Sequence, residues 1–97
     1  PIRVLIADDH PIVRQGVRSL LGAFPDIQVI GEADSPTTIR QEIETHRPDV
    51  ILLDVRLGAY NGISIARQLR RSHPDCRIII LTTYNDDEYL FGAIEAG

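Results

Sequence analysis

Three aspartates and one threonine stand where apolar runs of the sequence end. Asp8 and Asp9 directly follow the apolar run 2–7. Asp54 stands near the end of "DVILLDV", and Thr82 follows "IIIL". Clustered carboxylates must share protons or be neutralised, and Mg²⁺ prefers a few carboxylates, water and a phosphate oxygen as ligands. If the first and third runs form neighbouring strands, these side chains make one site for Mg²⁺ and a phosphate group.

Each of these residues also has a structural interpretation. Asp9, just before His10-Pro11, is a candidate helix N-cap. Asp54 could accept backbone hydrogen bonds in a turn, and Thr82 could be an ordinary β-branched strand residue. The functional interpretation depends on position, because ligands of open α/β sheets bind at the carboxyl ends of the strands. Three histidines show no metal-ligand spacing and are predicted to lie on the surface or in loops: His10, His46 and His73.

The elements that must position these residues alternate along the chain. Short apolar runs rich in Ile and Val predict strands buried on both faces, at 2–7, 27–31, 50–55 and 78–82. Apolar residues at helical spacing lie between and after them, and each helix has a start signal: Pro11, Ser35-Pro36, Asn61 and Asn85. The order βαβαβαβα predicts an α/β fold in which helices cover both faces of a parallel sheet.

Composition bounds the class of protein further. The chain has 97 residues, 43% of them hydrophobic, which suits one compact domain with a packed core. Cys76 is the only cysteine, which excludes an internal disulfide and predicts a reducing, cytoplasmic location. The net charge of −4 argues against binding of a nucleic-acid backbone by this domain. No apolar run approaches the length of a membrane span, so no membrane partner is expected.

Several stretches together carry a resemblance to a known family. They read "VLIADDHPIVRQGV", "GEAD", "RPDVILLDVRL" followed by "NG", and "IIILTTYNDDEYLFGAIEAG". The chain resembles the receiver domain of bacterial two-component response regulators, and is similar to the NarL/FixJ (LuxR-type) subgroup. The resemblance implies a flavodoxin-like (CheY-like) doubly wound sheet with strand order 2-1-3-4-5. It also implies one receiver domain over 1–97, with a C-terminal DNA-binding domain in the full-length protein that is absent here.

The resemblance also implies a role for individual residues. Asp54 matches the phosphoacceptor, which takes a phosphoryl group from a sensor histidine kinase. Asp9 would bind Mg²⁺ directly, Asp8 through water, and Arg56 through its backbone carbonyl. Thr82 would be the switch hydroxyl that bonds a phosphoryl oxygen. These roles imply a phosphorylation-controlled switch acting on transcription, with self-catalysed phosphoryl acceptance and no enzymatic turnover. A homodimer is a candidate assembly, and DNA is contacted only through the separate domain.

The sequence departs from the family pattern at two places. Gly58 stands where the family has a proline, so the loop after Asp54 loses a fixed φ angle. The family's fifth strand, its lysine and its fifth helix would follow Gly97. The edge of the predicted strand 78–82 is therefore expected to be covered by another chain or by a continuation of this one.

Two other functions fit parts of the pattern. One is a receiver-like protein-interaction module that is not phosphorylated in this form, because the lysine is absent. The other is a metal-dependent phosphatase of similar topology, which would need an acid two residues after its nucleophile. Arg56 stands two residues after Asp54 and His10 two residues after Asp8, so neither strand end offers that pair.

Overall fold

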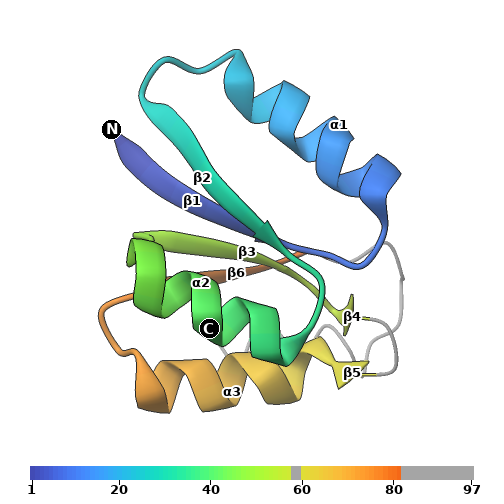
Figure 1. The fold of residues 1–97 in the computed structure, drawn as a ribbon, viewed down its shortest axis with the longest axis vertical. Coiled ribbons are helices and arrows are strands. Elements are labelled where there is room, and N and C mark those ends of the chain that lie inside the picture. Colours follow the sequence, from blue (N-terminus) through green and yellow to red (C-terminus); the bar gives the residue numbers. More distant parts are fainter. Residues whose placement is uncertain (58–59, 82–97) are drawn as a thin grey trace.

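A four-stranded parallel sheet forms the centre of the protein (Figure 1). The computed structural model describes residues 1–57 and 60–81. The strands are β1 (Ile2–Ala7), β2 (Ile27–Ala33), β3 (Val50–Asp54) and β6 (Arg77–Leu81). Their order is β2-β1-β3-β6, with every pairing parallel. The predicted doubly wound sheet is confirmed, and β1 and β3 are neighbours, as the site requires.

Among the described residues, three helices cover the sheet. They are α1 (Pro11–Gly22), α2 (Pro36–His46) and α3 (Gly62–Ser72). Figure 1 shows α1 on one side of the sheet and α2 and α3 on the other. None of the helices in the described part of the chain is long and apolar enough to cross a bilayer. The predicted fourth helix, from Asn85 onward, lies outside the described residues.

Alternating strand residues build the core on the α2 and α3 side. Leu5, Ile51, Leu53 and Ile78 are each at most 3% exposed. They cluster with the inward-facing helix residues Ile39, Ile43, Ile65 and Leu69. Burying an Ile or Leu side chain contributes about 1.5–3 kcal/mol, so this cluster is a main source of stability. It fixes the strands whose carboxyl ends carry the aspartates.

The helix starts follow from capping residues. Ser35 Oγ accepts a hydrogen bond from Thr38 N at 3.2 Å, completing a capping box at the start of α2. Asn61 Oδ1 accepts one from Ile63 N at 2.9 Å at the start of α3. Both predicted starts are confirmed. The N-cap of α1 is His10, without a side-chain cap bond, so the interpretation of Asp9 as a cap is wrong.

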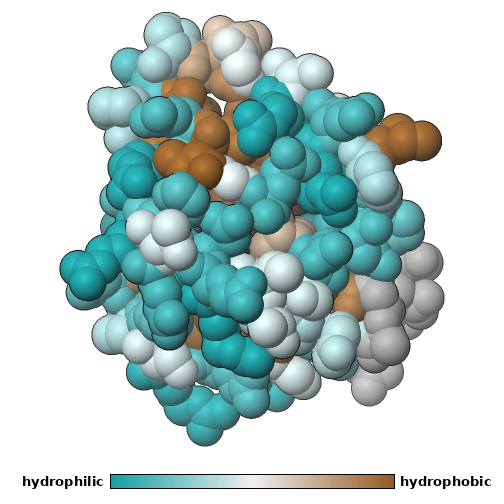
Figure 2. All heavy atoms as spheres, in the orientation of Figure 1, coloured by the Kyte–Doolittle hydropathy of each residue, from teal (hydrophilic) through white to brown (hydrophobic). Residues whose placement is uncertain are grey.

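The α1 side of the sheet is less completely packed. The apolar spacing correctly predicts α1, yet none of its residues is buried. Leu20 is 70% exposed, and Ile79 on β6 is 50% exposed. Figure 2 shows apolar atoms gathered where α1 lies beside β2, while polar atoms cover most of α2 and α3. In the described part of the chain, α1 alone covers this face, which leaves these side chains without a full set of neighbours.

A short antiparallel pair not predicted from the sequence follows β3. It consists of β4 (Arg56–Leu57) and β5 (Tyr60–Asn61). Leu57 is fully buried, whereas Tyr60 is 54% exposed. The pair turns the chain from the end of β3 back to the start of α3. It therefore helps to hold the carboxyl end of β3 next to the first turn of that helix.

Candidate metal and phosphoacceptor site

The three predicted carboxylates come together with one imidazole. Asp8, Asp9, His10 and Asp54 each offer a ligand atom, and these atoms lie within 4.8 Å of one another. Two strands bring them there, because Ala7 of β1 is in register with Leu53 of β3. Asp8 and Asp9 then leave β1 at the point where Asp54 ends β3. The predicted cluster of the three aspartates is confirmed.

The loop after β1 holds Asp8 firmly. Asp8 is 4% exposed. Its backbone N–H donates to the Ala33 carbonyl at 2.9 Å, which continues the pairing with β2. Its Oδ1 accepts a hydrogen bond from His10 N at 2.7 Å and lies 3.0 Å from His10 Nδ1. A carboxylate buried this deeply needs such partners, because an unpaired buried charge is strongly destabilising.

Asp9 presents a carboxylate oxygen that lacks a hydrogen bond. Its side chain is 29% exposed, yet Oδ1 itself is buried and has no hydrogen-bond partner among the described residues. His10 Nδ1 lies 2.9 Å from this oxygen, out of line for a hydrogen bond. A cation bound between the carboxylates would satisfy the oxygen, and carboxylate oxygens are the ligands that Mg²⁺ prefers. The residues present therefore fit a divalent metal ion.

The carboxylates around His10 raise the pKa of its imidazole. The hydrogen bond to Asp8 is the main cause that raises the pKa of the His10 imidazole, followed by the charge of Asp9. The charge of Asp54 acts in the same direction. Nearby carboxylates favour the charged form of an imidazole, so the shift reports the negative potential of the site. A negative potential of this kind favours the binding of a cation.

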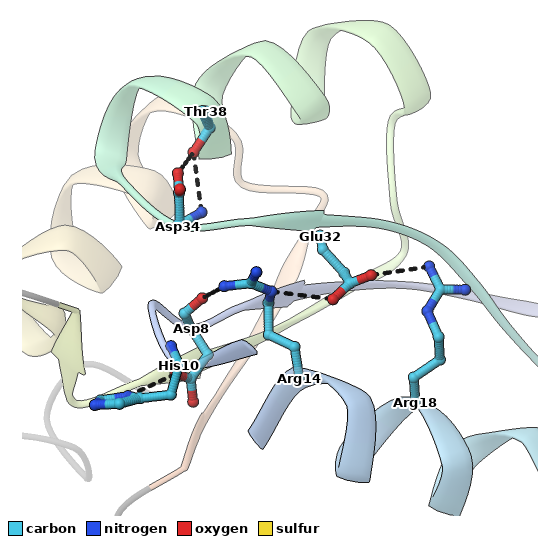
Figure 3. Close-up of polar contacts among 7 residues, drawn as sticks. All are labelled: Asp8, His10, Arg14, Arg18, Glu32, Asp34 and Thr38. Atoms are coloured by element: carbon cyan, nitrogen blue, oxygen red, sulfur yellow. Dashed lines mark hydrogen bonds and ion pairs between the residues drawn. The ribbon is translucent and has the colours of Figure 1, made fainter. Parts of the chain in front are cut away.

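An arginine fixes the main chain of the loop that carries Asp8 and Asp9. Arg14 Nη1 donates to the Asp8 carbonyl at 2.7 Å, and Arg14 Nε donates to Glu32 Oε1 at 3.0 Å. Arg18 Nη2 lies 3.3 Å from the second oxygen of Glu32. Figure 3 shows Arg14 between the Asp8 carbonyl and Glu32, with His10 on the opposite side of Asp8. This network ties the loop to α1 and β2.

Asp54 is positioned by close backbone packing around the end of β3. Val55 N donates to the Leu81 carbonyl at 3.0 Å, and Gly62 N donates to the Val55 carbonyl at 2.7 Å. A Cβ atom at Gly62 would overlap the Asp54 carbonyl oxygen and lie 2.8 Å from Val55 Cα. Only glycine allows α3 to begin this close to the end of β3. The "NG" pair quoted above therefore has a packing reason.

The remaining predicted site residues are placed only in part. Arg56 lies in β4 opposite Asn61, and the role of its carbonyl as a metal ligand stays a prediction. Thr82 and Gly58 lie outside the described residues. His10 is exposed, as predicted for a surface residue, but it also belongs to the cluster.

The sequence did not identify His10, Arg14 and Glu32 as parts of the candidate site or its supporting contacts. Their positions along the chain were the signal that could have identified them. His10 directly follows the two aspartates, and Arg14 lies one helical turn further along α1. Glu32 lies in "GEAD", on the strand next to β1.

Comparison with known proteins agrees with this arrangement. Residues 4–97 match the model of the response regulator receiver domain family. The chain is 46% identical over 96 residues to the DNA-binding transcriptional activator DevR/DosR of Mycobacterium tuberculosis (strain ATCC 25618 / H37Rv), covering 99% of this chain and 44% of that protein. The chain therefore belongs to the response regulator receiver domain family, and it spans less than half the length of this relative.

Solved structures support the same class. The isolated receiver domain of RcsB from Salmonella enterica serovar Typhimurium superposes with a TM-score of 0.91 at 28% identity, covering 98% of this chain and 71% of that one. The receiver domain of the response regulator NarL from Mycobacterium tuberculosis gives a TM-score of 0.88 at 31% identity, covering 99% and 77%. The predicted NarL/FixJ (LuxR-type) subgroup is confirmed by these similarities.

Proposed function

We propose that Asp54 of this receiver domain accepts a phosphoryl group in a reaction that depends on Mg²⁺. The observation that carries the proposal is the meeting of the Asp8, Asp9, His10 and Asp54 ligand atoms within 4.8 Å. Asp54 ends β3, where its carboxylate is only partly buried and can be reached by a donor. Phosphoryl transfer needs positioning and charge neutralisation more than covalent help, and the carboxyl end of this sheet supplies both.

The chemical step uses the ionised carboxylate of Asp54. One carboxylate oxygen attacks the phosphorus atom of a phosphohistidine on a partner kinase. The new O–P bond forms as the N–P bond breaks, and the electron pair returns to the imidazole nitrogen of the kinase, which then takes up a proton. The product is an acyl phosphate on Asp54. The domain is changed once in each event, so it acts as a switch and does not turn over substrate.

Four residues would hold the metal ion. Asp9 and Asp54 bind it directly, Asp8 binds it through water, and Arg56 contributes its backbone carbonyl. When bound, Mg²⁺ supplies positive charge that offsets the repulsion between the carboxylates and the phosphoryl oxygens. Arg14 holds the Asp8 carbonyl at 2.7 Å, and thereby keeps the metal-binding loop in place.

The output of the switch follows from the acyl phosphate. Its oxygens are new hydrogen-bond acceptors, and the hydroxyl of Thr82 would move to bond one of them. DevR/DosR is named a DNA-binding transcriptional activator. For this chain we propose a cytoplasmic regulator that receives phosphate from a sensor histidine kinase. It would act on transcription through a separate DNA-binding domain, with a homodimer as a candidate form.

Mass spectrometry with a small-molecule phosphodonor tests the proposal. Incubation with the donor and Mg²⁺ is expected to add one phosphoryl group to the intact chain, and peptide mapping to locate it at Asp54. Asp54→Asn should abolish the addition, because the amide cannot act as the nucleophile. Asp9→Ala should slow it at least about tenfold through loss of a direct metal ligand. Asp75→Asn, an exposed aspartate at the opposite end of the sheet, serves as the matched control.

Two results would overturn the proposal. One is labelling that persists in the Asp54→Asn variant. The other is a folded wild-type protein that gains no phosphoryl group at saturating donor and Mg²⁺. The second result would favour the alternative function, a receiver-like module that binds partners without being phosphorylated.

A further inference from the structure

We infer that His10 supplies a nitrogen ligand to the metal site, so that this site also binds borderline transition-metal ions in place of Mg²⁺. This inference rests on the proposed function, because it concerns the same site. The carboxylates alone provide a set of oxygen ligands suited to Mg²⁺. Adding the Nδ1 atom of His10 makes a mixed nitrogen and oxygen set, which suits ions such as Mn²⁺, Co²⁺ or Ni²⁺.

The distances around His10 fit a shared coordination sphere. His10 Nδ1 lies 3.0 Å from Asp8 Oδ1 and 2.9 Å from Asp9 Oδ1. In octahedral geometry with metal–ligand distances of about 2.0–2.1 Å, adjacent ligand atoms lie about 2.9 Å apart. The Nδ1 atom is therefore spaced from the oxygen of Asp9, the direct carboxylate ligand on this loop, as a neighbouring ligand would be. It is also the ring nitrogen that faces the carboxylates.

Without an ion, His10 Nδ1 forms a hydrogen bond with Asp8 Oδ1 and leaves the neighbouring Asp9 oxygen without one in the described part of the chain. His10 Nδ1 lies out of line for a hydrogen bond with Asp9 Oδ1, and this buried oxygen has no hydrogen-bond partner among the described residues. An ion at the centre of the cluster would satisfy this oxygen and the imidazole nitrogen together. Asp54 completes the set on the β3 side, since its ligand atom lies within the same 4.8 Å limit.

The main chain holds His10 at this position. Its backbone N–H donates to Asp8 Oδ1 at 2.7 Å. Pro11 follows it, which restricts His10 to extended backbone conformations, and the observed φ of −102° and ψ of 109° lie in that region. The His10 side chain is 62% exposed, so an ion can enter from solvent and retain water ligands. Figure 3 shows the ring beside the Asp8 side chain, away from Arg14.

Pulsed electron paramagnetic resonance with Mn²⁺ tests the inference. One equivalent of Mn²⁺ is added to the full chain without a phosphodonor, and the spin-echo modulation is examined for a directly bound imidazole nitrogen. We expect this nitrogen signal in the wild-type protein and in His46→Ala, whose imidazole contacts Glu42 outside the cluster. We expect its loss in His10→Ala. Isotopic labelling of histidine nitrogen in the wild-type protein should change the signal, so the result does not depend on the variant folding.

Calorimetric titration gives a second readout. His10→Ala should lower the affinity for Co²⁺ by about tenfold or more, because imidazole is a favourable ligand for that ion. The affinity for Mg²⁺ should change by less than about threefold, since Mg²⁺ favours the oxygen ligands that remain. His46→Ala should leave both affinities at the wild-type values.

The outcomes separate this inference from the proposed function. Mn²⁺ bound without a nitrogen signal in the wild-type protein would overturn the inference. So would an unchanged ratio of Co²⁺ to Mg²⁺ affinity in folded His10→Ala. In both cases, Mg²⁺-dependent labelling of Asp54 would leave the proposed function intact. Failure of the wild-type protein to bind any divalent ion would overturn both.

Discussion

The two ends of the sheet differ in how their charged groups are paired. At the carboxyl end, Asp8, Asp9 and Asp54 converge with one histidine, which leaves an excess of negative charge. At the amino end, the carboxylate of Asp49 accepts a hydrogen bond from the backbone N–H of Arg3 at 2.8 Å. The Arg3 guanidinium in turn donates to the Arg47 carbonyl at 3.2 Å.

This difference indicates that the two ends of the same strands have different roles, one in stability and the other in function. The amino end pairs its polar groups with groups of the same chain. The carboxyl end gathers three carboxylates whose charge an added ion would neutralise. Substitutions at the amino end should therefore change the free energy of unfolding and leave phosphorylation intact. Substitutions at the carboxyl end should change metal binding and phosphorylation as well.

Gly62→Ala should have the largest effect on stability at the carboxyl end. The added methyl group would overlap the Asp54 carbonyl oxygen, so the backbone must move. We expect a loss of about 3 kcal/mol in the free energy of unfolding, measured by urea denaturation, together with slower labelling of Asp54. Gly16→Ala is the matched control, because a Cβ there meets no atom within 4 Å. An unchanged free energy for Gly62→Ala would contradict the packing argument.

Alkaline pH should weaken the amino end through Cys76. Burial raises the pKa of the Cys76 thiol from 9.0 to about 11, with a smaller contribution from the charge of Asp49. The folded protein therefore holds this proton more tightly than the unfolded chain. The resulting stability is fully present below pH 9, and about 2 kcal/mol of it is lost as the pH rises to about 11.

Denaturation at about pH 8 and about pH 11 measures this effect. In Cys76→Ala the decrease in the free energy of unfolding between these pH values should be smaller by about 2 kcal/mol. The two proteins share every other side chain, so the remaining pH dependence cancels in the comparison. Equal decreases in wild type and variant would show that the thiol does not titrate as described.

Arg14→Met tests whether Arg14 positions the loop that carries Asp8 and Asp9. The change removes the hydrogen bonds to the Asp8 carbonyl and to Glu32, and keeps a side chain of similar length. We expect a loss of about 1–2 kcal/mol in stability and about tenfold in Mg²⁺ affinity, measured by denaturation and calorimetry. Arg18→Met removes only the more exposed contact with Glu32 and should cost less than about 1 kcal/mol. Equal Mg²⁺ affinities for the two variants would argue against a positioning role of Arg14.

Asp49→Ala should have a small effect on stability and should leave function unchanged. It removes the carboxylate that accepts the hydrogen bond of Arg3 N, an exposed interaction worth about 1 kcal/mol. Labelling of Asp54 should proceed at the wild-type rate, as measured by intact mass spectrometry. A fall in labelling with unchanged stability would show that the two ends of the sheet are coupled.

Periodic features of the sequence predicted most of the fold. The Ile- and Val-rich runs located the four long strands, and Ser35 and Asn61 marked two helix starts. The β4–β5 pair was not predicted, because two-residue strands leave no periodic pattern. The exposure of α1 was not predicted either. It depends on which elements cover each face of the sheet, and spacing along one helix does not contain that information.

The candidate site was predicted in part. Asp8, Asp9 and Asp54 were found because strand ends converge at one edge of a parallel sheet. His10 was not predicted because it shows no metal-ligand spacing, but the other members of its cluster lie on another strand as well as next to it. Arg14 and Glu32 were missed because their contact joins a helix to a strand. The roles of Arg56 and Thr82 stay predictions.

Mg²⁺ titration followed by thermal unfolding tests the central claim most directly. The claim is that Asp8, Asp9 and Asp54 together hold one divalent ion. At a Mg²⁺ concentration of about 100 times Kd, the wild-type protein should gain about 2.7 kcal/mol of stability. Asp75→Asn should gain the same, and Asp9→Asn should gain little at that concentration. If Mg²⁺ stabilises Asp9→Asn as strongly as wild type, or stabilises neither, the three carboxylates do not form the proposed site.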